Sequence, residues 1–426
     1  KLQIRLAKNS GVVVKIANPA KLITEKSEFN QAVVIDAVFG VGFKGKLEGD
    51  LAKFTEYINM FDSVKVAVDI PSGVNGSNGK VEGVAVKCDY TITFGVNKLG
   101  IAVYPGKDYA GEIVVADIGF PKKALEMVSP DTFTFDESQI SYYMPERREY
   151  SNKGDFGKIL IIAGSEEMCG ASFLSALAAY RTGGGLVRLF VPEANRQSLQ
   201  NLLPEAILTT YGDSTDKAIS KVTADKLEKA VKEWAAAIVI GPGLGLTKRS
   251  KSLVDKTLEI SEVRTVIDAD GLTLFREIIE KRENDPVKDM KKNYILTPHI
   301  KELADLLYLP KEEVKENIVQ IAKELKCCNG EIVIKEARTL VTGSGKCYIN
   351  NSGNSGMAKA GSGDVLTGIL AALIATEKQR PFMVTPLGVY IHGLAGDMLK
   401  EKKGKYGIIA RELADEVAEV MKRYSD

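Results

Sequence analysis

Short apolar runs alternate with amphipathic stretches through most of this 426-residue sequence. Buried parallel strands are apolar on both faces and are joined by helical crossovers, so this alternation is typical of parallel α/β layers. In the first third, the expected strands are the β-branched runs Ala32–Ile35, Val64–Val68, Tyr90–Phe94 and Glu112–Ala116. With a helix expected at Leu51–Phe61, the pattern predicts a doubly wound Rossmann-like sheet that lacks its first strand and helix.

The stretch Pro121–Tyr150 has no clear period and is predicted to be a linker or an irregular connection. After it the alternation resumes, with strands expected at Ile159–Ala163, Leu186–Val191, Ala236–Ile240, Thr265–Asp268 and Tyr294–Thr297, and helices at Ser172–Thr182 and Ala410–Tyr424. The runs Glu331–Ile334, Thr339–Thr342 and Lys346–Ile349 are expected to be antiparallel. A chain of this length exceeds one ordinary core, so we expect more than one α/β domain.

Charge and cysteine content exclude several classes of function. Lys and Arg total 57 against 56 Asp and Glu, which gives no electrostatic reason to expect nucleic acid or an anionic membrane as partner. No apolar stretch reaches the roughly 18–20 residues that span a bilayer. The five cysteines form no CxxC pair, and we expect them to be small buried residues in a reducing compartment. These features predict a cytoplasmic protein.

Two acidic residues end strands in the first third. Asp36 is followed by the glycine turn Gly40–Lys46, and Asp69 is followed by a Pro71–Gly73 turn that aims Ser72 back toward the same edge. Glycine turns after strands are common and an Asx-type turn also explains Asp69, so a purely structural role stays open for each motif. Because Asp36 and Asp69 both end strands of one sheet, we predict that they lie in a shared crevice.

Near the C-terminus a loop of small residues, Asn354–Gly363, runs into Asp364 and then into an apolar helix. The glycines leave backbone N–H groups bare at a helix start, where the positive end of the helix dipole favours phosphate oxygens. A carboxylate beside a bound polyphosphate suggests removal of a proton from a hydroxyl substrate. The loop therefore predicts a phosphate cradle with one catalytic acid.

Further motifs follow the expected strands of the second half: Gly164–Ser165 before a helix that starts near Ala171, Gly241–Gly245, Asp268–Gly271, Thr297–Glu302 and Lys335–Thr339. Thr297 is expected to be an N-cap and Pro298 the first helical residue, which places His299 at a helix start and suits a neutral hydrogen-bonding role toward a ligand. Lys335 and Arg338 either contact a nucleotide phosphate or are solvated surface charges. His392, in an apolar helix, is expected to be a core histidine satisfied by a neighbour.

Taken in order, the motifs DxxFGxG, VDIPSG, KGDFGKILIIAGS, GPGLG, DADGL, TPHxKE and NSGMxxAGSGDVLTG resemble those of the bifunctional NAD(P)H-hydrate repair enzymes. The resemblance implies an NAD(P)HX epimerase domain over residues 1–135 and a ribokinase-like, ADP- or ATP-dependent (S)-NAD(P)HX dehydratase domain over residues 136–426. It also implies NAD(P)HX and an adenine nucleotide as ligands, with a homo-oligomer as a further expectation.

In the dehydratase half, the resemblance makes Asp364 the catalytic carboxylate that meets the hydrated nicotinamide, in a substrate pocket lined by Ala171, Gly243 and His299. The nucleotide-binding residues that it implies are Lys335, Glu336, Ala337, Arg338, Thr339, Asn354, Ser355, Gly356, Met357, Ala358, Lys359, Ala360, Gly361, Ser362 and Gly363. ADP is the expected nucleotide, with ATP as the alternative and Mg²⁺ as a further candidate.

In the epimerase half, the resemblance places Asp36 and Ser72 at a potassium ion and makes Asp69 the catalytic residue that contacts substrate near the epimerised carbon. The substrate phosphates would be held by Gly40, Val41, Gly42, Phe43, Lys44, Gly45 and Lys46.

The sequence departs from the family pattern at three places. The family's Asn-Asn-x-Gly-Asp segment lies ahead of the region matched here, so an incomplete epimerase domain is expected. Ala360 replaces a usual glycine and Asn152 a common histidine; the added methyl at Ala360 is tolerated if its φ is negative. The alternatives are a ribokinase-like kinase for a small alcohol such as a vitamin precursor, and an N-terminal domain that is a non-catalytic binding scaffold.

Overall fold

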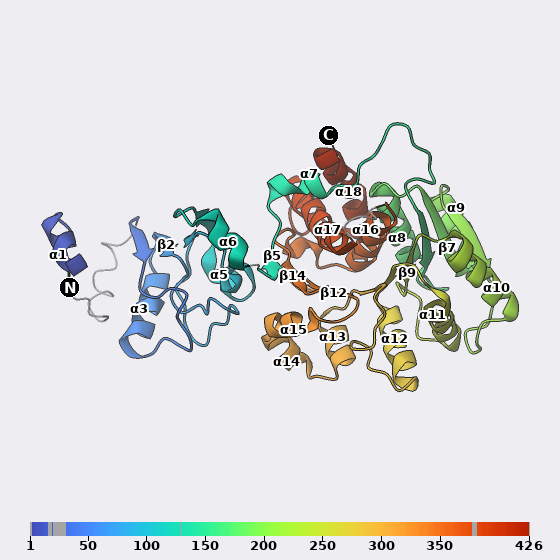
Figure 1. Ribbon diagram of the computed structural model, residues 1–426, viewed down its shortest axis with the longest axis horizontal. Helices are drawn as coiled ribbons and strands as arrows, with labels where there is room; N and C mark the ends of the chain where they lie inside the picture. Colours follow the sequence, from blue (N-terminus) through green and yellow to red (C-terminus); the bar gives the residue numbers. More distant parts are fainter. Residues whose placement is uncertain (1, 16–18, 20–30, 129, 377–380, 426) are drawn as a thin grey trace. The chain divides into compact units, whose positions relative to one another are not determined.

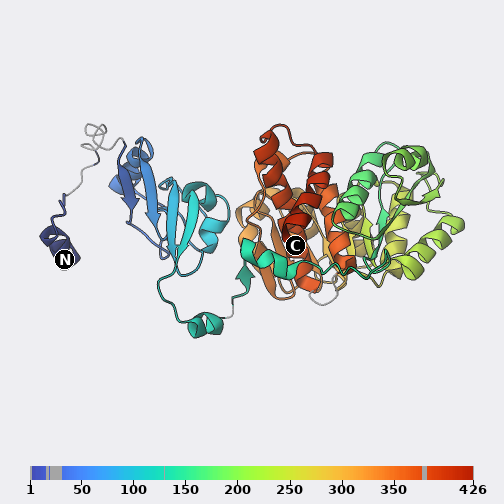
Figure 2. The ribbon, with the colours of Figure 1, turned by 90° about the horizontal axis from the view of Figure 1, so that it is seen from above.

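The strands expected in the first third form one parallel sheet in the computed structural model, which describes residues 2–15, 19, 31–128, 130–376 and 381–425. The chain divides into unit 1, Lys1–Ser129, and unit 2, Pro130–Asp426 (Figure 1). Unit 1 contains β1 (Val33–Asp36), β2 (Val64–Val68), β3 (Tyr90–Phe94) and β4 (Glu112–Ala116), side by side in that order (Figure 2). Its helices are α1 (Leu2–Asn9), α3 (Gly49–Asn59), α4 (Leu99–Ala102), α5 (Gly106–Ala110) and α6 (Lys122–Val128).

The two faces of this first sheet differ in burial. Asp36, Lys65, Ala67, Thr91 and Thr93 point to a buried face. Alternate residues on the other face remain open to solvent: Val33 and Ile35 are each 65% exposed, Val64 45% and Ile92 39%. Because side chains alternate along a strand, this exposed set marks one continuous apolar face.

Unit 2 is built on a mixed sheet, which among the described residues has the order β5-β14-β13-β12-β11-β10-β9-β6-β7-β8. Its strands are β5 (Thr132–Phe133), β6 (Lys158–Ile162), β7 (Leu186–Pro192), β8 (Ile207–Tyr211), β9 (Ala237–Ile240), β10 (Thr265–Ile267), β11 (Tyr294–Leu296), β12 (Glu331–Ile334), β13 (Leu340–Gly343) and β14 (Lys346–Ile349). From β8 to β12 neighbouring strands are parallel, and β12, β13 and β14 pair antiparallel as predicted.

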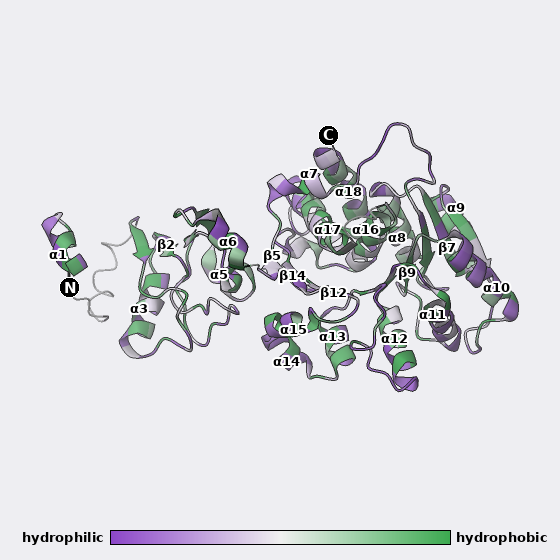
Figure 3. Ribbon diagram, viewed as in Figure 1, coloured by the Kyte–Doolittle hydropathy of each residue, from purple (hydrophilic) through white to green (hydrophobic). Residues whose placement is uncertain are grey.

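The helices of unit 2 are α7 (Ile140–Tyr143), α8 (Cys169–Arg181), α9 (Arg196–Leu202), α10 (Lys221–Lys229), α11 (Lys248–Ile260), α12 (Asp270–Lys281), α13 (Ile300–Leu307), α14 (Lys311–Glu316), α15 (Ile318–Leu325), α16 (Ser362–Thr376), α17 (Pro381–Lys403) and α18 (Ala410–Ser425). Figure 1 shows α8, α16, α17 and α18 on one face of the sheet and α11, α12, α13 and α15 on the other. The strands between these layers are hydrophobic, whereas α10 at the outside is mainly hydrophilic (Figure 3). This arrangement is the mixed α/β architecture that the alternating pattern predicts.

Helix α16 is the central apolar element of unit 2. Its residues from Val365 to Ala375 are buried, and its side chains join one core with β6, β7, β9 and the helices α8, α17 and α18. A Cβ on Gly368 would meet the backbone oxygen of Ser175 in α8, so only glycine allows this close approach of the two helices. The packing fixes the first turn of α16, where the phosphate cradle is expected.

The structure differs from the sequence predictions in the stretch Pro121–Tyr150. It contains α6, β5 and α7, and β5 pairs parallel with β14. A two-residue strand has no sequence period, so this edge pairing depends on tertiary contact rather than on a local pattern. Elsewhere the observed bounds equal the predicted ones or differ from them by a few residues, which is usual for element ends.

The cysteine prediction is wrong in part. Cys88 and Cys347 are buried and Cys169 and Cys328 half-buried, but Cys327 is exposed; all of them are free thiols. Within the described residues, no helix is both long enough and apolar enough to cross a bilayer.

Two candidate active sites

Asp36 and Ser72 meet at the carboxyl edge of the first sheet. The Asp36 carboxylate accepts hydrogen bonds from the Ser72 amide (2.7 Å) and from its hydroxyl (2.6 Å), and the Ser72 hydroxyl accepts the Phe39 amide at 3.0 Å. Asp36 is only 5% exposed, and it forms no ion pair with a lysine or arginine in the described part of the chain. A buried carboxylate without a cationic partner, with a hydroxyl oxygen beside it, fits the oxygen donors that a potassium ion takes.

Asp69 lies at the end of β2 in the same sheet. It is one of the few non-glycine residues with a positive φ, +71°, a strained conformation that is typical of functional sites. Its carboxylate pairs with the Lys98 ammonium at 2.8 Å and accepts the Thr93 hydroxyl at 3.2 Å. Burial raises the pKa of Asp69, but the hydrogen bond and charge of Lys98, with the Phe94 amide and the Thr93 hydroxyl, outweigh it and lower the pKa below its usual value.

The glycine turn after β1 reaches this carboxylate. A Cβ on Gly40 would lie 3.6 Å from Asp69 Oδ2, so the turn and the end of β2 lie close together at this edge of the sheet. The shared crevice stays a prediction. The rest of the turn is open, with Lys44 exposed and Lys46 paired to Glu48 at 3.0 Å. Backbone amides and long lysine side chains in this turn suit phosphate oxygens.

In unit 2, the loop ahead of α16 is held by its own side chains. Asn354 accepts the Gly356 amide at 3.0 Å and caps the short 3-10 helix η5 (Ser355–Met357), while the Ser362 hydroxyl donates to Met357 O at 2.7 Å. The Asp397 carboxylate in α17 accepts the Gly353 amide (2.7 Å) and the Asn354 side-chain amide (3.0 Å). These bonds preorganise the loop before any ligand binds.

Backbone conformation adds to this order. Gly361 has a φ of +90°, and a Cβ there would lie 2.6 Å from Leu174 Cδ1 and 2.8 Å from Ala410 Cβ. Ala360, which replaces a usual glycine, is not among the residues with positive φ, so its methyl group introduces no backbone strain.

Asp364 lies in the first turn of α16, where the loop ends. Burial raises the pKa of its carboxyl from 3.8 to about 7, with a further increase from the charges of Asp268 and Asp270 and a decrease from Lys335. A carboxyl that titrates near neutral pH can take up a proton and release it again, which is what a general base in this position requires.

A salt bridge lies beside this carboxyl. Lys335, directly after β12, donates to Asp268 Oδ1 at 2.5 Å, and the Thr297 hydroxyl donates to the same oxygen at 2.7 Å. The Asp268 side chain is 2% exposed. Burial lowers the pKa of Lys335, but the charges of Asp268 and Glu302 outweigh it and raise the pKa above its usual value.

The remaining predicted nucleotide residues after β12 lie toward solvent. Glu336 and Ala337 are exposed, and the Thr339 hydroxyl donates to Glu336 O at 3.4 Å. Arg338 reaches Asn350 O at 3.5 Å, while its buried Nε has no hydrogen-bond partner in the described residues. The segment therefore presents Lys335 inward and leaves Glu336 and Ala337 in solvent.

His299 is the N-cap of α13, and Ile300 is its first residue, so the prediction of Thr297 as N-cap and Pro298 as first helical residue was wrong. The cause is tertiary: Pro298 O accepts the Lys335 amide at 2.8 Å, and His299 forms a parallel bridge with Lys335, which keeps this stretch extended. His299 Nδ1 accepts the Glu302 amide at 3.1 Å, and Glu302 Oε2 accepts the His299 amide at 2.8 Å. The His299 side chain remains 52% exposed and open to a ligand.

Two further predicted pocket residues meet across the sheet edge. A Cβ on Gly243, whose φ is +59°, would lie 2.9 Å from Ala171 Cβ in the first turn of α8. Nearby, the Gly245 amide donates to Asp270 Oδ2 at 2.8 Å. The structure thus brings Ala171 and Gly243 together, while Asp270 links the Gly241–Gly245 turn to the charges around Asp364.

The prediction of His392 as a core histidine satisfied by a neighbour is confirmed in part, because the ring forms a hydrogen bond with the Ser362 backbone. Its Nε2 is enclosed without a partner among the described residues. Burial lowers the pKa of His392 to about 4, and the charge of Lys335 lowers it further. A hydrogen bond with the Ser362 backbone acts in the opposite direction and raises the pKa. A neutral imidazole therefore lies behind the start of α16.

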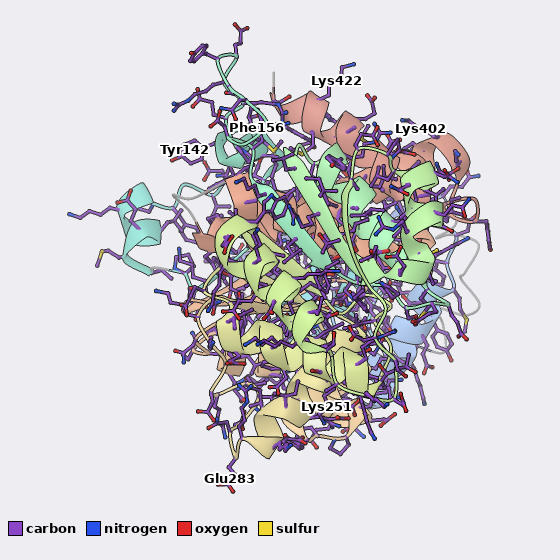
Figure 4. All side chains as sticks on the ribbon, turned by 90° about the vertical axis from the view of Figure 1, so that its right-hand side faces the viewer. Tyr142, Phe156, Lys251, Glu283, Lys402 and Lys422 are labelled. Carbon is purple, nitrogen blue, oxygen red and sulfur yellow. The ribbon has the colours of Figure 1, made fainter. Side chains whose placement is uncertain are left out.

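A cavity of about 880 Å³ lies at the other end of α16, where Thr376 lines it. Figure 4 shows three of its lining residues, Tyr142, Phe156 and Lys422, on the same side of unit 2. The loop before β6 forms one wall, with Arg147 over the Phe156 ring at 3.8 Å. The replaced histidine position, Asn152, is also in this loop and accepts the Gly154 amide at 2.8 Å. Asp364 lies at the opposite end of the helix, so the cavity takes no part in the chemistry of that carboxyl.

Sequence reasoning did not assign Lys98, Asp268, Glu302 and Asp397 to the sites. Asp268 and Glu302 stand in the motifs DADGL and TPHxKE, which was a usable signal. Lys98 and Asp397 carry no local signal, because their partners lie 29 and more residues away in the chain.

Comparison with known proteins agrees with this architecture. The sequence model of the family described as NAD(P)H-hydrate dehydratase matches residues 159–419, and the one described as YjeF-related protein N-terminus matches residues 1–100. The bifunctional NAD(P)H-hydrate repair enzyme of Thermofilum pendens is 35% identical over 98% of this chain and 80% of its own length. The enzyme of the same name from Moorella thermoacetica is 34% identical over 92% of this chain and 73% of its own.

Solved structures match about two thirds of the chain. A ribokinase-like superfamily protein of Enterococcus faecalis has a TM-score of 0.59 at 28% identity and covers 69% of this chain and 97% of its own. The ADP/ATP-dependent NAD(P)H-hydrate dehydratase of Bacillus subtilis, co-crystallised with ATP and Mg²⁺, has a TM-score of 0.57 at 28% identity, over 68% of this chain and 97% of its own. With both halves matched over most of its length, this chain belongs to the family of bifunctional NAD(P)H-hydrate repair enzymes.

Proposed function

We propose that this chain repairs hydrated nicotinamide nucleotides, with nucleotide-dependent dehydration of (S)-NAD(P)HX in unit 2 and epimerisation of (R)-NAD(P)HX in unit 1. The observation that carries the proposal is Asp364, a carboxyl with a pKa of about 7 where a glycine loop meets a helix start. Membership of the bifunctional family supports both activities. Epimerisation makes the unreactive R hydrate available to the dehydratase, which explains the fusion of the two units.

For the dehydratase we propose that the ring hydroxyl of the hydrate attacks the terminal phosphorus of ADP, which releases AMP while the hydroxyl proton passes to Asp364. The C–O bond then breaks: phosphate leaves with the bonding electrons, and the ring nitrogen lone pair assists. The neighbouring carbon then loses a proton to the departing phosphate, which restores the double bond. Phosphorylation replaces a hydroxide-like leaving group with a good one. The residues then need to supply position and one base.

The binding roles follow from the arrangement around Asp364. Residues 354–363 offer backbone N–H groups to the phosphates, and Lys335 offers an ammonium on the same side. Residues 336–339 would contact the rest of the nucleotide. Ala171, Gly243 and His299 would line the hydrate pocket, with His299 as a hydrogen-bonding group. Mg²⁺ would accompany the nucleotide and neutralise part of its charge, as in the Bacillus subtilis relative crystallised with ATP and Mg²⁺.

For the epimerase we propose that Asp69, ionised and paired with Lys98, contacts the substrate near the epimerised carbon. The turn Gly40–Lys46 would hold the substrate phosphates. Asp36 and Ser72 would hold a potassium ion, whose charge would balance the buried carboxylate and favour an anionic substrate. We propose in addition a cytoplasmic location and a homo-oligomeric state.

The test is an assay of hydrated NADH with ADP, with ATP and with no nucleotide, followed by the return of NADH absorbance. We expect recovery with ADP, with AMP and phosphate as co-products. Recovery without any nucleotide would contradict the proposal. A small-alcohol kinase, the alternative, would instead release a stable phosphorylated alcohol. Purified R hydrate as substrate tests unit 1, and a non-catalytic scaffold there would leave the R form unrepaired.

A further inference from the structure

The charges around Asp364 are unevenly balanced. Four carboxylates lie in this region, those of Asp268, Asp270, Glu302 and Asp364. The charge of each acts on the pKa of another of them or on the pKa of the Lys335 ammonium. Carboxylates that share a site cannot all be ionised without a cation. The position of the Lys335 ammonium therefore bears on the charge balance around Asp364.

The structure places this ammonium on Asp268. Lys335 Nζ donates to Asp268 Oδ1 at 2.5 Å, whereas no ion pair joins it to Asp364 within the described residues. The Thr297 hydroxyl donates to the same Asp268 oxygen at 2.7 Å, which fixes the carboxylate from the other side. Asp268 is directly after β10 and Lys335 directly after β12, so two strand ends hold the pair.

The pair lies over the first turn of α16. A Cβ on Gly363 would be 3.4 Å from Lys335 Nζ and 3.5 Å from Asp268 Oδ2. The salt bridge is therefore packed beside the backbone of Gly363, at the helix start where nucleotide phosphates are expected. An ammonium held there faces both the expected phosphates and Asp364.

We propose that Asp268 is a positioning residue of the dehydratase: it holds the Lys335 ammonium over the start of α16, beside Asp364 rather than on it. The inference rests on the proposed function of unit 2 and adds a residue to it. Asp268 thereby leaves Asp364 available to take a proton from the hydrate and leaves Lys335 available to the phosphates.

The protonation of Asp364 also depends on the other titratable groups that lie around Asp364 and Lys335. Asp268 and Asp270 come from the β10 edge, Glu302 and His299 from α13, and His392 from α17. Without the charge of Asp268, one source that raises the pKa of Asp364 is lost, and Lys335 is released toward Glu302 and Asp364, the other carboxylates whose charges act on it. Both changes lower the pKa of Asp364 and weaken it as a base.

The test compares the full chain with its Asp268→Asn variant in two measurements. In the pH dependence of kcat/KM for the hydrate, we expect the acidic limb, near pH 7 in the unchanged chain, to move down by about 1 to 2 pH units. In calorimetric titration with ADP, we expect binding about tenfold weaker, since a charge-assisted hydrogen bond from a misplaced ammonium is lost. Asp268→Glu keeps the charge and should restore most of the original pH profile.

Asp255→Asn is the matched control, because it makes the same substitution at an exposed carboxylate of α11 that pairs with Arg282 and is not among the groups that act on Asp364 or Lys335. It should leave the affinity for ADP unchanged. If Asp268→Asn lowers the melting temperature but moves neither the acidic limb nor the ADP affinity, Asp268 is structural only and the proposal is wrong. If the unchanged chain repairs no hydrate with either nucleotide, the proposed function fails, and the ADP affinities alone decide: tenfold weaker binding supports the positioning role, and equal binding overturns it.

Discussion

Replacement of Asp364 by Asn tests the energetic meaning of its raised pKa. The folded chain holds this carboxyl protonated up to about pH 7, whereas the unfolded chain ionises it from its ordinary pKa of 3.8. Between these two values the unfolded state binds fewer protons than the folded state, so stability falls as the pH rises and is constant above this window. A shift of one pKa unit corresponds to about 1.4 kcal/mol. Relative to a pH below both values, the free energy of unfolding is therefore lower by about 2 kcal/mol at pH 5 and by at most about 4 kcal/mol at pH 8.

Asp364→Asn removes the titrating group and keeps the shape of the side chain. The variant should lose hydrate repair and yet be more stable than the unchanged chain, by an amount that grows with pH. For a unit of about 300 residues, these free energies correspond to melting temperatures raised by about 3 °C at pH 5 and about 6 °C at pH 8. Such stabilisation is expected where a group needed for activity destabilises the folded state.

Thermal unfolding of the full chain, followed at pH 5 and pH 8, measures this difference. Asp255→Asn is the control, because it makes the same substitution at an exposed carboxylate of α11 and should show no such growth with pH. A variant that is less stable than the unchanged chain at pH 8 would refute the reasoning. Equal stabilisation at both pH values would refute it as well, since it would show that the effect is unrelated to ionisation.

Three other substitutions have defined outcomes. Asp69→Asn should abolish repair of the R hydrate and leave dehydration of the S hydrate unchanged, as measured with the separated epimers; loss of both activities would contradict the separate sites. Gly361→Ala should raise the KM for ADP at least tenfold, because the new methyl group would lie 2.6 Å from a leucine side chain. The control is Gly404→Ala, which also has a positive φ but no neighbour within 4 Å and should leave the KM unchanged. Gly368→Ala should destabilise unit 2 by several kcal/mol through its clash with the α8 backbone, and Gly170→Ala, a helical glycine without close neighbours, should not; equal melting curves for the two would show that the helices do not need their close approach.

The strands and the strand-end residues were predictable from sequence because both follow from local rules. Strands β2, β3 and β4 have the predicted bounds, since β-branched residues at a pleated surface give a clear pattern. The meeting of Asp36 with Ser72 follows from parallel strands that end at one edge. The functional roles of these residues remain predictions.

Features that depend on distant partners were not predictable. The start of α13 was misplaced because the Lys335 amide, from another strand, binds the carbonyl that a helix would use. Strand β5 is two residues long and exists through its pairing with β14. The ammonium of Lys335 was expected at a phosphate or in solvent, and only the fold shows that its first partner is Asp268.

The cap at the start of α13 also fixes the chemistry that His299 can offer. Its Nδ1 accepts the Glu302 amide and so cannot carry a proton while the cap is intact. The neutral ring is therefore confined to one tautomer, with its hydrogen on Nε2. His299 Nε2 lies 3.5 Å from Glu302 Oε1, and a ligand that contacts His299 at this nitrogen must also present an acceptor, such as a phosphate, hydroxyl or carboxamide oxygen. The helix cap thus fixes the polarity of the exposed His299 ring before any ligand binds.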